Sequence, residues 1–491
     1  MFQTALACNQ IQKHNTRMEK STKIVATIGP ATETEEVLEQ LILAGMNVAR
    51  FNTKHGEPSW HHERIRRVRS VAEKLQKSVG VLIDLQGPEI RTILPEGTDS
   101  FDTKAGDIIT FTSNQSSTEE RTVIVPPELI AAVKNDDKIL IEDGLGEFLV
   151  LEKEGDTVKV KVLEDLVVKK RKTLNTPGVD IDMPSLIPSD LEHLDAATND
   201  LVDFVALSFV RSAQDIAILR EELKKRNLNA QIVAKIENQA SVDNLDEIIQ
   251  AADAVMVARG DLGVEVPYQE LAHWQKVAIY KSRIYAKPVI TATQMLMSMV
   301  NSPRPSRAEV SDVANAVYDG TDAVMLSDET TIGKFPVKSV ATQAAIVQYT
   351  EDFARPPVID PEDIDTSTSV THAAISLLMA SDRPTNPFKV DQVVCLSETG
   401  TTARYLSRYR FVRNIHVLTN SKQTYNRLSI VYGVETHVVD FESENLGDED
   451  QITQKIKDLG IAQAGNTVLL VHGSFWKQPG LTNTLRVLVV K

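Results

Sequence analysis

Short apolar runs rich in Val, Ile and Ala recur along the chain from Lys23 to Ser327, and each ends in polar residues or glycine. Their nearly continuous apolar character is typical of parallel strands that are covered on both faces. The segments between them, such as residues 33–45 and 211–227, have the apolar spacing of amphipathic helices. Eight strands that alternate with helices predict a (β/α)8 TIM barrel. The runs are KIVATIGP (23–30), MNVARFN (46–52), VGVLIDL (79–85), DFVALSF (203–209), QIVAKIE (231–237), AVMVARG (254–260), KPVITAT (287–293) and AVMLS (323–327).

Two further units accompany the barrel, which we expect to comprise residues 21–87 and 177–352. Residues 88–176 separate the third and fourth runs and contain strictly alternating stretches such as DTVKVKV, so they predict an inserted small β-barrel-like domain. Loops at the C-terminal ends of strands cover the active face of a barrel, so this insert is expected to act as a lid. A Pro- and Asp-rich linker (351–367) begins the last part of the chain, and residues 353–491 predict a C-terminal doubly wound α/β domain.

Composition narrows the class of protein. The net charge of the 491 residues is −15, which argues against a nucleic-acid binder and against adhesion to an anionic membrane. The two cysteines, Cys8 and Cys395, do not make a disulfide framework and favour a reducing cytoplasmic location. Residues 1–20 lack a basic segment ahead of a sustained apolar core, so we expect a disordered tail rather than a signal peptide.

Polar side chains stand at the predicted C-terminal end of nearly every barrel strand, where catalytic residues of such barrels lie. Glu237 and Asp261 come from adjacent strands and suit one divalent cation such as Mg²⁺. Lys235 and Arg50 are cations directed at the same mouth, which favours a phosphorylated or carboxylated substrate. The full set of strand-end residues is Thr27, Arg50, Asn52, Asp84, Ser208, Lys235, Glu237, Arg259, Asp261, Thr293 and Ser327.

Each of these residues, taken alone, also has a purely structural interpretation. Lys235 and Glu237 lie two apart on one strand and fit a buried ion pair equally well. Asp261 in the stretch GDLG fits a helix cap better than a metal ligand. His61 and His62 fit solvated positions on a basic helix. The catalytic interpretation gains its weight from the combination, because all strand ends share one face of the barrel.

Three stretches in this order and spacing, AKIEN, ARGDLG and TATQML, are specific to one family, and DLQGPEIRT, PRPSRAEVSDVANAVYDGTDAVMLSDET and GLTNTLRV accompany them. On these residues the chain resembles pyruvate kinase from about Lys23 to its end. The resemblance implies phosphoryl transfer from phosphoenolpyruvate to ADP, giving pyruvate and ATP in the last step of glycolysis. Two alternatives are a catalytically silent regulatory or binding homologue and another Mg²⁺-dependent barrel enzyme acting on a small oxo-acid, such as an aldolase.

The resemblance also implies roles for individual residues. Lys235 is similar to the lysine that stabilises the phosphoryl group in transit, and Arg50 is similar to a phosphate-binding arginine. Glu237 and Asp261 look like ligands of Mg²⁺ or Mn²⁺, and Thr293 matches a position near the site of enolate protonation. The implied substrate-binding residues are Arg50, Lys235, Gly260, Asp261 and Thr293, and the implied ADP/ATP-binding residues are Arg91, Lys172 and His55.

The chain departs from the family at its monovalent cation site. Members that need K⁺ usually show N-F-S-H-G and D-T-K-G-P-E-I-R, whereas this chain reads NTKHG and DLQGPEIR. Lys54 replaces a serine ligand and Leu85 a threonine, while Asn52, Asp84 and Glu89 are kept. We hypothesise that the Lys54 ammonium supplies the missing monovalent charge. In the alternative, Lys54 points to solvent and K⁺ binds through Asn52, Asp84 and backbone oxygens.

The resemblance places an effector and a subunit contact in the C-terminal part of the chain. The stretch SETGTTARYL opens a predicted helix with hydroxyls and a glycine, which suits a phosphate group. Family members that bind a bisphosphate show a lysine where Glu398 stands, so a monophosphate effector, or none, is expected. The family forms homotetramers. Asp328 stands where glycine is usual. The candidate effector residues are Ser397, Thr399, Thr401 and Thr402.

Overall fold

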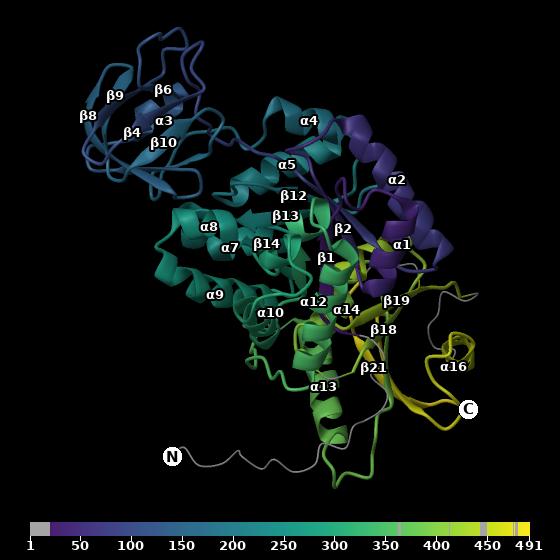
Figure 1. Cartoon of the computed structure of the whole chain (residues 1–491). Coiled ribbons are helices and arrows are strands. Elements are labelled where there is room, and N and C mark those ends of the chain that lie inside the picture. The colour runs from purple at the N-terminus through teal and green to yellow at the C-terminus, as the bar shows by residue number, and fades with distance from the viewer. Residues whose placement is uncertain (1–19, 362–364, 412, 442–448, 475, 477–479) are drawn as a thin grey trace, which may run out of the picture.

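Eight parallel strands close into a barrel in the order β1-β16-β15-β14-β13-β12-β3-β2, which confirms the predicted fold class (Figure 1). The computed structural model describes residues 20–361, 365–411, 413–441, 449–474, 476 and 480–491. The predicted tail, residues 1–20, lies outside this part of the chain except for Lys20. The barrel strands are β1 (Lys23–Thr27), β2 (Val48–Asn52), β3 (Gly80–Asp84), β12 (Phe204–Leu207), β13 (Gln231–Ile236), β14 (Ala254–Ala258), β15 (Val289–Ala292) and β16 (Ala323–Leu326).

Helices cover the outside of the barrel because alternate strand residues face opposite ways. Ile24 and Ala26 of β1 belong to the cluster beneath the helices, whereas Val25 belongs to the barrel interior. The caps follow from sequence: the Thr34 side chain accepts a hydrogen bond from the Val37 amide at the start of the first helix. The helices of this unit are α1 (Glu35–Ala44), α2 (Pro58–Lys74), α4 (Pro188–Asp195), α5 (Ala213–Lys225), α6 (Gln239–Asp243), α7 (Leu245–Ala251), α8 (Arg259–Glu265), α9 (Leu271–Ile284), α10 (Arg307–Asp319), α11 (Asp328–Thr331) and α12 (Pro336–Glu351).

The segment between β3 and β12 forms a separate β-rich unit that stands away from the barrel (Figure 1). A six-stranded sheet and a two-stranded sheet enclose a core in which the rings of Phe111 and Phe148 meet edge to face with centroids 5.3 Å apart. Asn175 at its return donates to Glu265 of α8 over 2.7 Å. Its elements are β4 (Ser100–Thr103), β5 (Ile108–Thr112), β6 (Thr122–Ile124), α3 (Pro127–Ala132), β7 (Lys138–Ile141), β8 (Gly146–Glu154), β9 (Thr157–Val162), β10 (Leu166–Lys169) and β11 (Leu174–Asn175).

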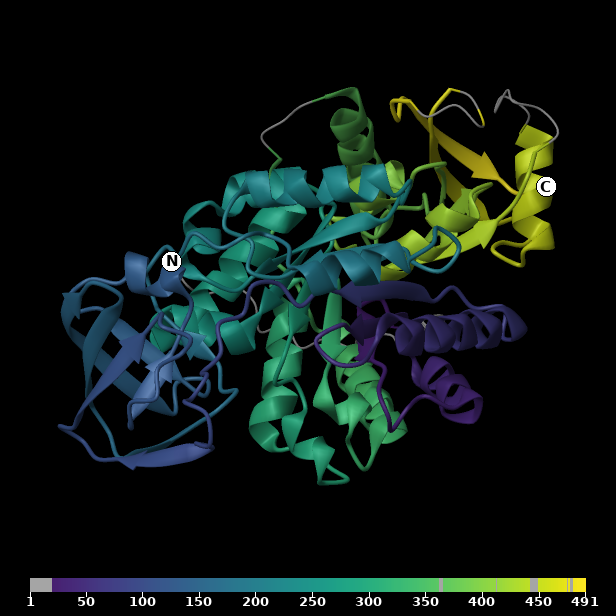
Figure 2. The same ribbon diagram turned by 90° about the horizontal axis from the view of Figure 1, so that it is seen from above.

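The C-terminal unit is a five-stranded sheet in the order β19-β18-β17-β20-β21, parallel except for its last strand. Seen from above, this unit and the β-rich insert lie on opposite sides of the barrel (Figure 2). The strands are β17 (Gln392–Leu396), β18 (Ile415–Thr419), β19 (Val434–Val438), β20 (Thr467–His472) and β21 (Thr484–Val489), and the helices are α13 (Thr366–Ser381), α14 (Thr401–Ser407), α15 (Lys422–Arg427) and α16 (Glu449–Asp458).

The C-terminal unit closes the N-terminal end of the barrel. Val25 and Leu82 of the barrel interior share one buried cluster with Val417 of β18. Asp322, just before β16, forms a buried ion pair with Arg410 at 2.6 Å. The Lys23 ammonium at the start of β1 donates to the carbonyl oxygen that begins β19 over 2.7 Å. The barrel interior and the C-terminal unit therefore share a single apolar core.

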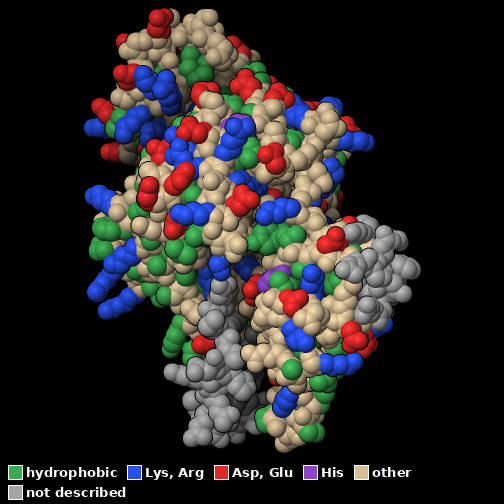
Figure 3. Space-filling view, turned by 90° about the vertical axis from the view of Figure 1, so that its right-hand side faces the viewer, with side chains coloured by type: hydrophobic (Ala, Val, Ile, Leu, Met, Phe, Trp, Pro, Cys, Tyr) green, Lys and Arg blue, Asp and Glu red, His purple; other side chains and the backbone are tan. Residues whose placement is uncertain are grey.

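The surface charge agrees with the composition. On the face in Figure 3, lysine and arginine side chains are interspersed with aspartate and glutamate, without a basic stripe among the described atoms. Within the described residues, no helix has both the length and the apolar character needed to cross a bilayer.

Candidate active site

A chain of alternating charges links the C-terminal ends of four neighbouring barrel strands. Asp84 at the end of β3 accepts from Arg50 of β2, with Nε at 2.7 Å and Nη2 at 2.6 Å. The Lys235 ammonium of β13 lies 3.3 Å from Asp84 Oδ1 and 2.7 Å from Glu237 Oε1. It also donates to Ser208 Oγ, just after β12, over 2.7 Å. The structure thus brings together four of the charged strand-end residues that the sequence singles out, whereas Arg259 pairs with Asp312 instead.

Burial makes the charges of this group depend on one another. Burial alone lowers the pKa of Lys235, but the facing carboxylates of Asp84 and Glu237 outweigh it and raise that pKa. Burial raises the pKa of Asp84, yet Lys235 and Arg50 outweigh it and hold that pKa below its usual range. Lys235 therefore keeps its positive charge at neutral pH in a site shielded from water.

Glu237 directly follows β13, and its neighbour Asp261 lies in the first turn of α8, which follows the adjacent strand β14. Burial raises the pKa of Glu237, and the Asp261 carboxylate raises it further against the opposing effect of Lys235. Glu237 Oε2 accepts from the Phe209 amide over 2.8 Å, while the buried Oε1 faces the Lys235 ammonium at 2.7 Å. Two neighbouring carboxylates, one of them buried, repel each other and therefore favour the binding of a cation.

Strained backbone holds Thr293 against Gly260. Thr293 has φ +67°, a left-handed conformation that is rare for a β-branched residue and is often found at functional sites. Its Oγ accepts from the Gly260 amide over 2.7 Å. Arg259 fixes this loop by donating to the carbonyl oxygens of Ala292 at 3.1 Å and Thr293 at 2.6 Å. The end of β15 is thereby clamped to the start of α8.

A second ionic group lies where the barrel meets the β-rich insert. Lys54 Nζ is 2.7 Å from Glu89 Oε1, and Arg91 Nη2 is 2.9 Å from Glu89 Oε2. The Lys54 amide donates to Asn52 Oδ1 over 3.2 Å. The Lys54 side chain therefore turns toward the retained glutamate and is 30% exposed.

The other two residues implied in nucleotide binding lie apart from this group. Lys172 pairs with Glu142 inside the insert. His55 is exposed, and its carbonyl oxygen accepts from the ring of His61 at 2.8 Å. The expected solvated position of His61 is wrong: it is 4% exposed and contacts Phe51 edge to face. The helical spacing of α2 turns this histidine toward the barrel rather than toward water.

The candidate effector residues surround the loop between β17 and α14. Gly400 has φ +81°, and its amide donates to Ser397 Oγ over 3.1 Å. The hydroxyls of Thr399 and Thr401 lie 3.0 Å apart near the surface. Thr402 is buried, and its hydroxyl bonds with that of Thr482 at 2.7 Å, so this side chain faces inward.

Sequence reasoning gave no role to several residues that shape the site. Glu329 is buried and accepts from the amides of Leu296 at 2.9 Å and Ser327 at 2.8 Å, so it joins the loops after β15 and β16. Its only sequence signal is an acidic residue soon after the eighth strand. Asp328 is exposed at the first position of α11, where a negative charge suits the helix N-terminus.

Comparisons with known proteins point to one family. The family model described as pyruvate kinase, barrel domain, matches residues 19–340, and the model described as pyruvate kinase, alpha/beta domain, matches residues 376–488. The chain is 39% identical to pyruvate kinase of Bacillus licheniformis over 96% of this chain and 80% of that protein. It is 38% identical to pyruvate kinase of Geobacillus stearothermophilus over 96% of this chain and 81% of that protein. A solved pyruvate kinase from Cryptosporidium parvum has a TM-score of 0.87 and 32% identity, with 96% of each chain covered.

Proposed function

The chain belongs to the pyruvate kinase family, and from this we propose a specific role for each residue around Lys235. The enzyme transfers the phosphoryl group of phosphoenolpyruvate to ADP and releases pyruvate and ATP. The observation that carries the assignment is the position of the Lys235 ammonium, 2.7 Å from Glu237 and 3.3 Å from Asp84 at the mouth of the barrel. No other described lysine lies between two buried strand-end carboxylates in this way.

Lys235 and Arg50 neutralise the phosphoryl group during transfer. Phosphoryl transfer depends mainly on positioning and on stabilising charge that spreads over the phosphoryl oxygens. Lys235 is held by Ser208 and two carboxylates, and Arg50 is held by Asp84 and by Thr27 over 2.9 Å. Both cations are fixed before substrate binds, so little reorganisation accompanies the reaction.

Glu237 and Asp261 fit a divalent metal ion. They follow adjacent strands, their charges repel each other, and the Glu237 side chain is only 1% exposed. Carboxylate oxygens are the ligands that Mg²⁺ and Mn²⁺ prefer. When bound, the ion would neutralise negative charge on the substrate oxygens. The Gly260 amide precedes Asp261 in the chain and bonds with the Thr293 hydroxyl, and these two groups would orient the substrate carboxylate and the carbon that receives the proton.

The nucleotide is assigned to the side of the site nearest the insert. Arg91 and Lys172 lie on the two segments that connect the barrel with the insert, and the amide of Thr92 donates to the Lys172 carbonyl oxygen over 2.8 Å. Both cations are already paired with carboxylates, Glu89 and Glu142. ADP phosphates would exchange with these carboxylates as the lid closes, with His55 on the exposed edge.

Lys54 replaces the monovalent cation. Its ammonium contacts Glu89, one of the acidic residues that this chain shares with K⁺-dependent members of the family. Asp84, the other retained acidic position, has both carboxylate oxygens facing cations, Arg50 and Lys235. A lysine ammonium and K⁺ carry the same charge. Lys54 therefore supplies the monovalent positive charge that other members of the family commonly obtain by binding K⁺ from solution.

Replacement of Lys235 by methionine tests the central assignment. Lys235→Met keeps the aliphatic bulk and removes the charge, so kcat should fall by at least about a hundredfold. Lys276→Met, which removes an exposed ammonium paired with Asp319, is the matched control and should keep full activity. Pyruvate formation from phosphoenolpyruvate, ADP and Mg²⁺ measures both variants, with thermal melts to check folding. A folded Lys235→Met enzyme with nearly unchanged kcat would contradict the assignment.

The C-terminal unit carries the candidate effector site. We infer that a monophosphorylated effector binds the exposed hydroxyls of Thr399 and Thr401 near Ser397. Binding of labelled sugar phosphates to a Thr401→Ala, Thr402→Ala variant tests this, and unchanged binding would exclude the site.

We also propose a homotetramer, measured by light scattering, and a cytoplasmic location, in accord with the free buried thiol of Cys395.

A further inference from the structure

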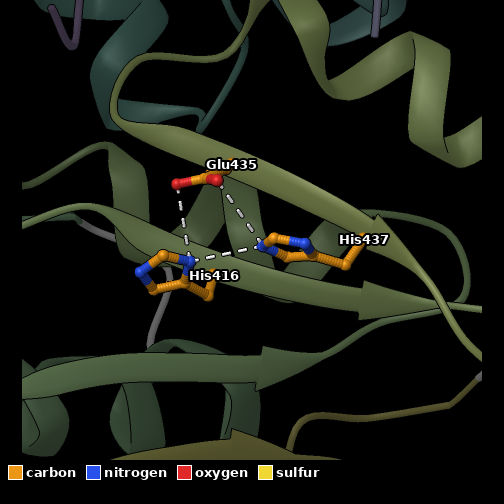
Figure 4. Close-up of side chains that lie close together, drawn as sticks. All are labelled: His416, Glu435 and His437. Carbon is orange, nitrogen blue, oxygen red and sulfur yellow. Dashed lines mark hydrogen bonds and ion pairs between the residues drawn. The ribbon is translucent and has the colours of Figure 1, made fainter. Parts of the chain in front are cut away.

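Two histidines and a glutamate meet on the sheet of the C-terminal unit, far from the active site. His416 lies on β18, and Glu435 and His437 lie on the neighbouring strand β19 (Figure 4). In the parallel register His416 is paired with Glu435, and His437 is two residues further along. Residues two apart on a strand point to the same face, so all three side chains emerge together.

This face is the one turned away from the barrel. Ile415 and Val417, on either side of His416, belong to the apolar cluster shared with the barrel interior. Leu418 belongs to the separate cluster beneath the opposite face, and strand alternation places His416 on that side. The group therefore has no part in the catalytic machinery at the other end of the barrel.

The spacing of the ligand atoms matches a transition-metal site. His416 Nδ1 lies 3.3 Å from His437 Nε2, and Glu435 oxygens lie 3.6 Å from the former and 3.8 Å from the latter. Metal–nitrogen bonds of about 2.0–2.1 Å in a tetrahedral arrangement place two nitrogens about 3.3 Å apart. The two rings already have this spacing, and the carboxylate needs only a small rotation to complete three ligands.

The environment suits metal binding. Burial lowers the pKa values of His416 and His437, which favours the neutral imidazole, the form that binds a metal. The glutamate side chain is 48% exposed and leaves an entry path from solvent. Among the described residues, this is the single group of three or more His, Cys, Asp or Glu side chains with ligand atoms this close together.

We propose that His416, Glu435 and His437 form a binding site for one Zn²⁺-class transition-metal ion, with the fourth position open to water. Two imidazoles and one carboxylate favour zinc and its neighbours over Mg²⁺ and Ca²⁺, which prefer oxygen ligands alone. The inference is independent of the role assigned to any active-site residue.

Metal binding would join the edge strand β19 to β18. The carbonyl oxygen of Val434, next to Glu435, accepts from the Lys23 ammonium of the first barrel strand over 2.7 Å. An ion bound only by the folded protein raises its stability, so Zn²⁺ should increase the melting temperature of the whole chain.

Cobalt titration of the full-length enzyme tests the site. The protein is first treated with chelator, and excess Mg²⁺ is then added to occupy Glu237 and Asp261. Co²⁺ should bind with a single equivalent that develops the strong visible bands of tetrahedral nitrogen coordination, and Zn²⁺ should displace it. His416→Ala and His437→Ala should abolish these bands, whereas His273→Ala, a change at an exposed histidine, should keep them.

A second variant, Glu435→Gln, separates loss of metal binding from loss of folding. Glu435→Gln alters a half-exposed side chain without removing bulk, and it should weaken Zn²⁺ binding by at least about tenfold while the folded state is retained. Absence of the bands in the unaltered protein would overturn the proposal and leave a hydrogen-bonded histidine pair. Equal bands in His416→Ala, or unchanged Zn²⁺ affinity in Glu435→Gln, would assign the metal to other residues and overturn it as well.

Discussion

Replacing Lys54 with serine should convert this enzyme into one that depends on K⁺. The change restores the side chain that K⁺-dependent relatives of this family usually carry and leaves Glu89 in place. In the present structure the Lys54 ammonium lies 2.7 Å from Glu89 Oε1, and the Glu89 side chain is only 9% exposed. Without the ammonium, an under-compensated carboxylate would stand beside the site of two anionic substrates.

The size of the effect follows from the contact. Two charges 2.7 Å apart attract by about 6 kcal/mol at an effective dielectric constant of about 20. The partial exposure of Lys54 and the second contact of Glu89 with Arg91 reduce the net loss. A charged hydrogen bond of this kind contributes about 1–3 kcal/mol, which corresponds to a loss of about 5- to 150-fold in kcat/KM. K⁺ should recover most of this loss by occupying the position of the ammonium.

The assay is pyruvate formation in a nominally K⁺-free buffer with tetramethylammonium to hold the ionic strength constant. Unaltered enzyme should change little as K⁺ is added, whereas Lys54→Ser should rise toward its activity. Lys74→Ser, which breaks an exposed lysine–glutamate pair of 2.9 Å, controls for the loss of a lysine and should not respond to K⁺. An unaltered enzyme that is inactive without K⁺, or a Lys54→Ser enzyme indifferent to it, would refute the reasoning.

Three further outcomes are expected. Asp261→Asn should raise the Mg²⁺ concentration for half-maximal activity by at least about tenfold, measured by metal titration of kcat, because it removes one of two facing carboxylates. Arg410→Met should lower the free energy of unfolding by about 3–5 kcal/mol in urea melts, because it leaves Asp322 buried without its ionic partner. Burial lowers the pKa of His61 to about 4, so its contribution to stability is complete above pH 6.5 and is lost as the pH falls through 4. This loss amounts to about 3 kcal/mol, and His61→Gln should remove it from the pH dependence of denaturant midpoints.

Sequence patterns predicted the barrel because strand and helix periodicity are local properties. Each of the eight apolar runs contains one barrel strand, and the strand-end residues Arg50, Lys235 and Glu237 do converge. Convergence follows from one rule: parallel strands in a closed barrel end at the same rim. Once the strands are located in the sequence, the side chains that lie together at the rim of the barrel are therefore predicted as well.

Contacts that depend on barrel closure were beyond the reach of sequence patterns. Asp84 is a K⁺ ligand only in the alternative in which Lys54 points to solvent, and its pairing in the structure with Arg50 and Lys235, from two other strands, has no signal in the sequence. Burial of His61 depends on the angle at which α2 packs against the barrel, which the histidine pair in its sequence does not encode. The left-handed backbone of Thr293 has no sequence signal, since threonine rarely adopts it.

The shared core at the N-terminal end of the barrel has a consequence for how this protein can be rebuilt. Val25 and Leu82 are sheltered from water by side chains of the C-terminal sheet, including Val417. Removing that sheet would expose an apolar surface at the N-terminal end of the barrel. The isolated barrel would therefore aggregate and would not serve as a smaller enzyme. A chimaera with the C-terminal sheet of another protein would fold only if the grafted side chains were complementary in shape to this apolar surface. The grafted unit would also have to fit closely over Gly80, because Ser429 of the present unit packs so near this glycine that an added Cβ would collide with its Oγ.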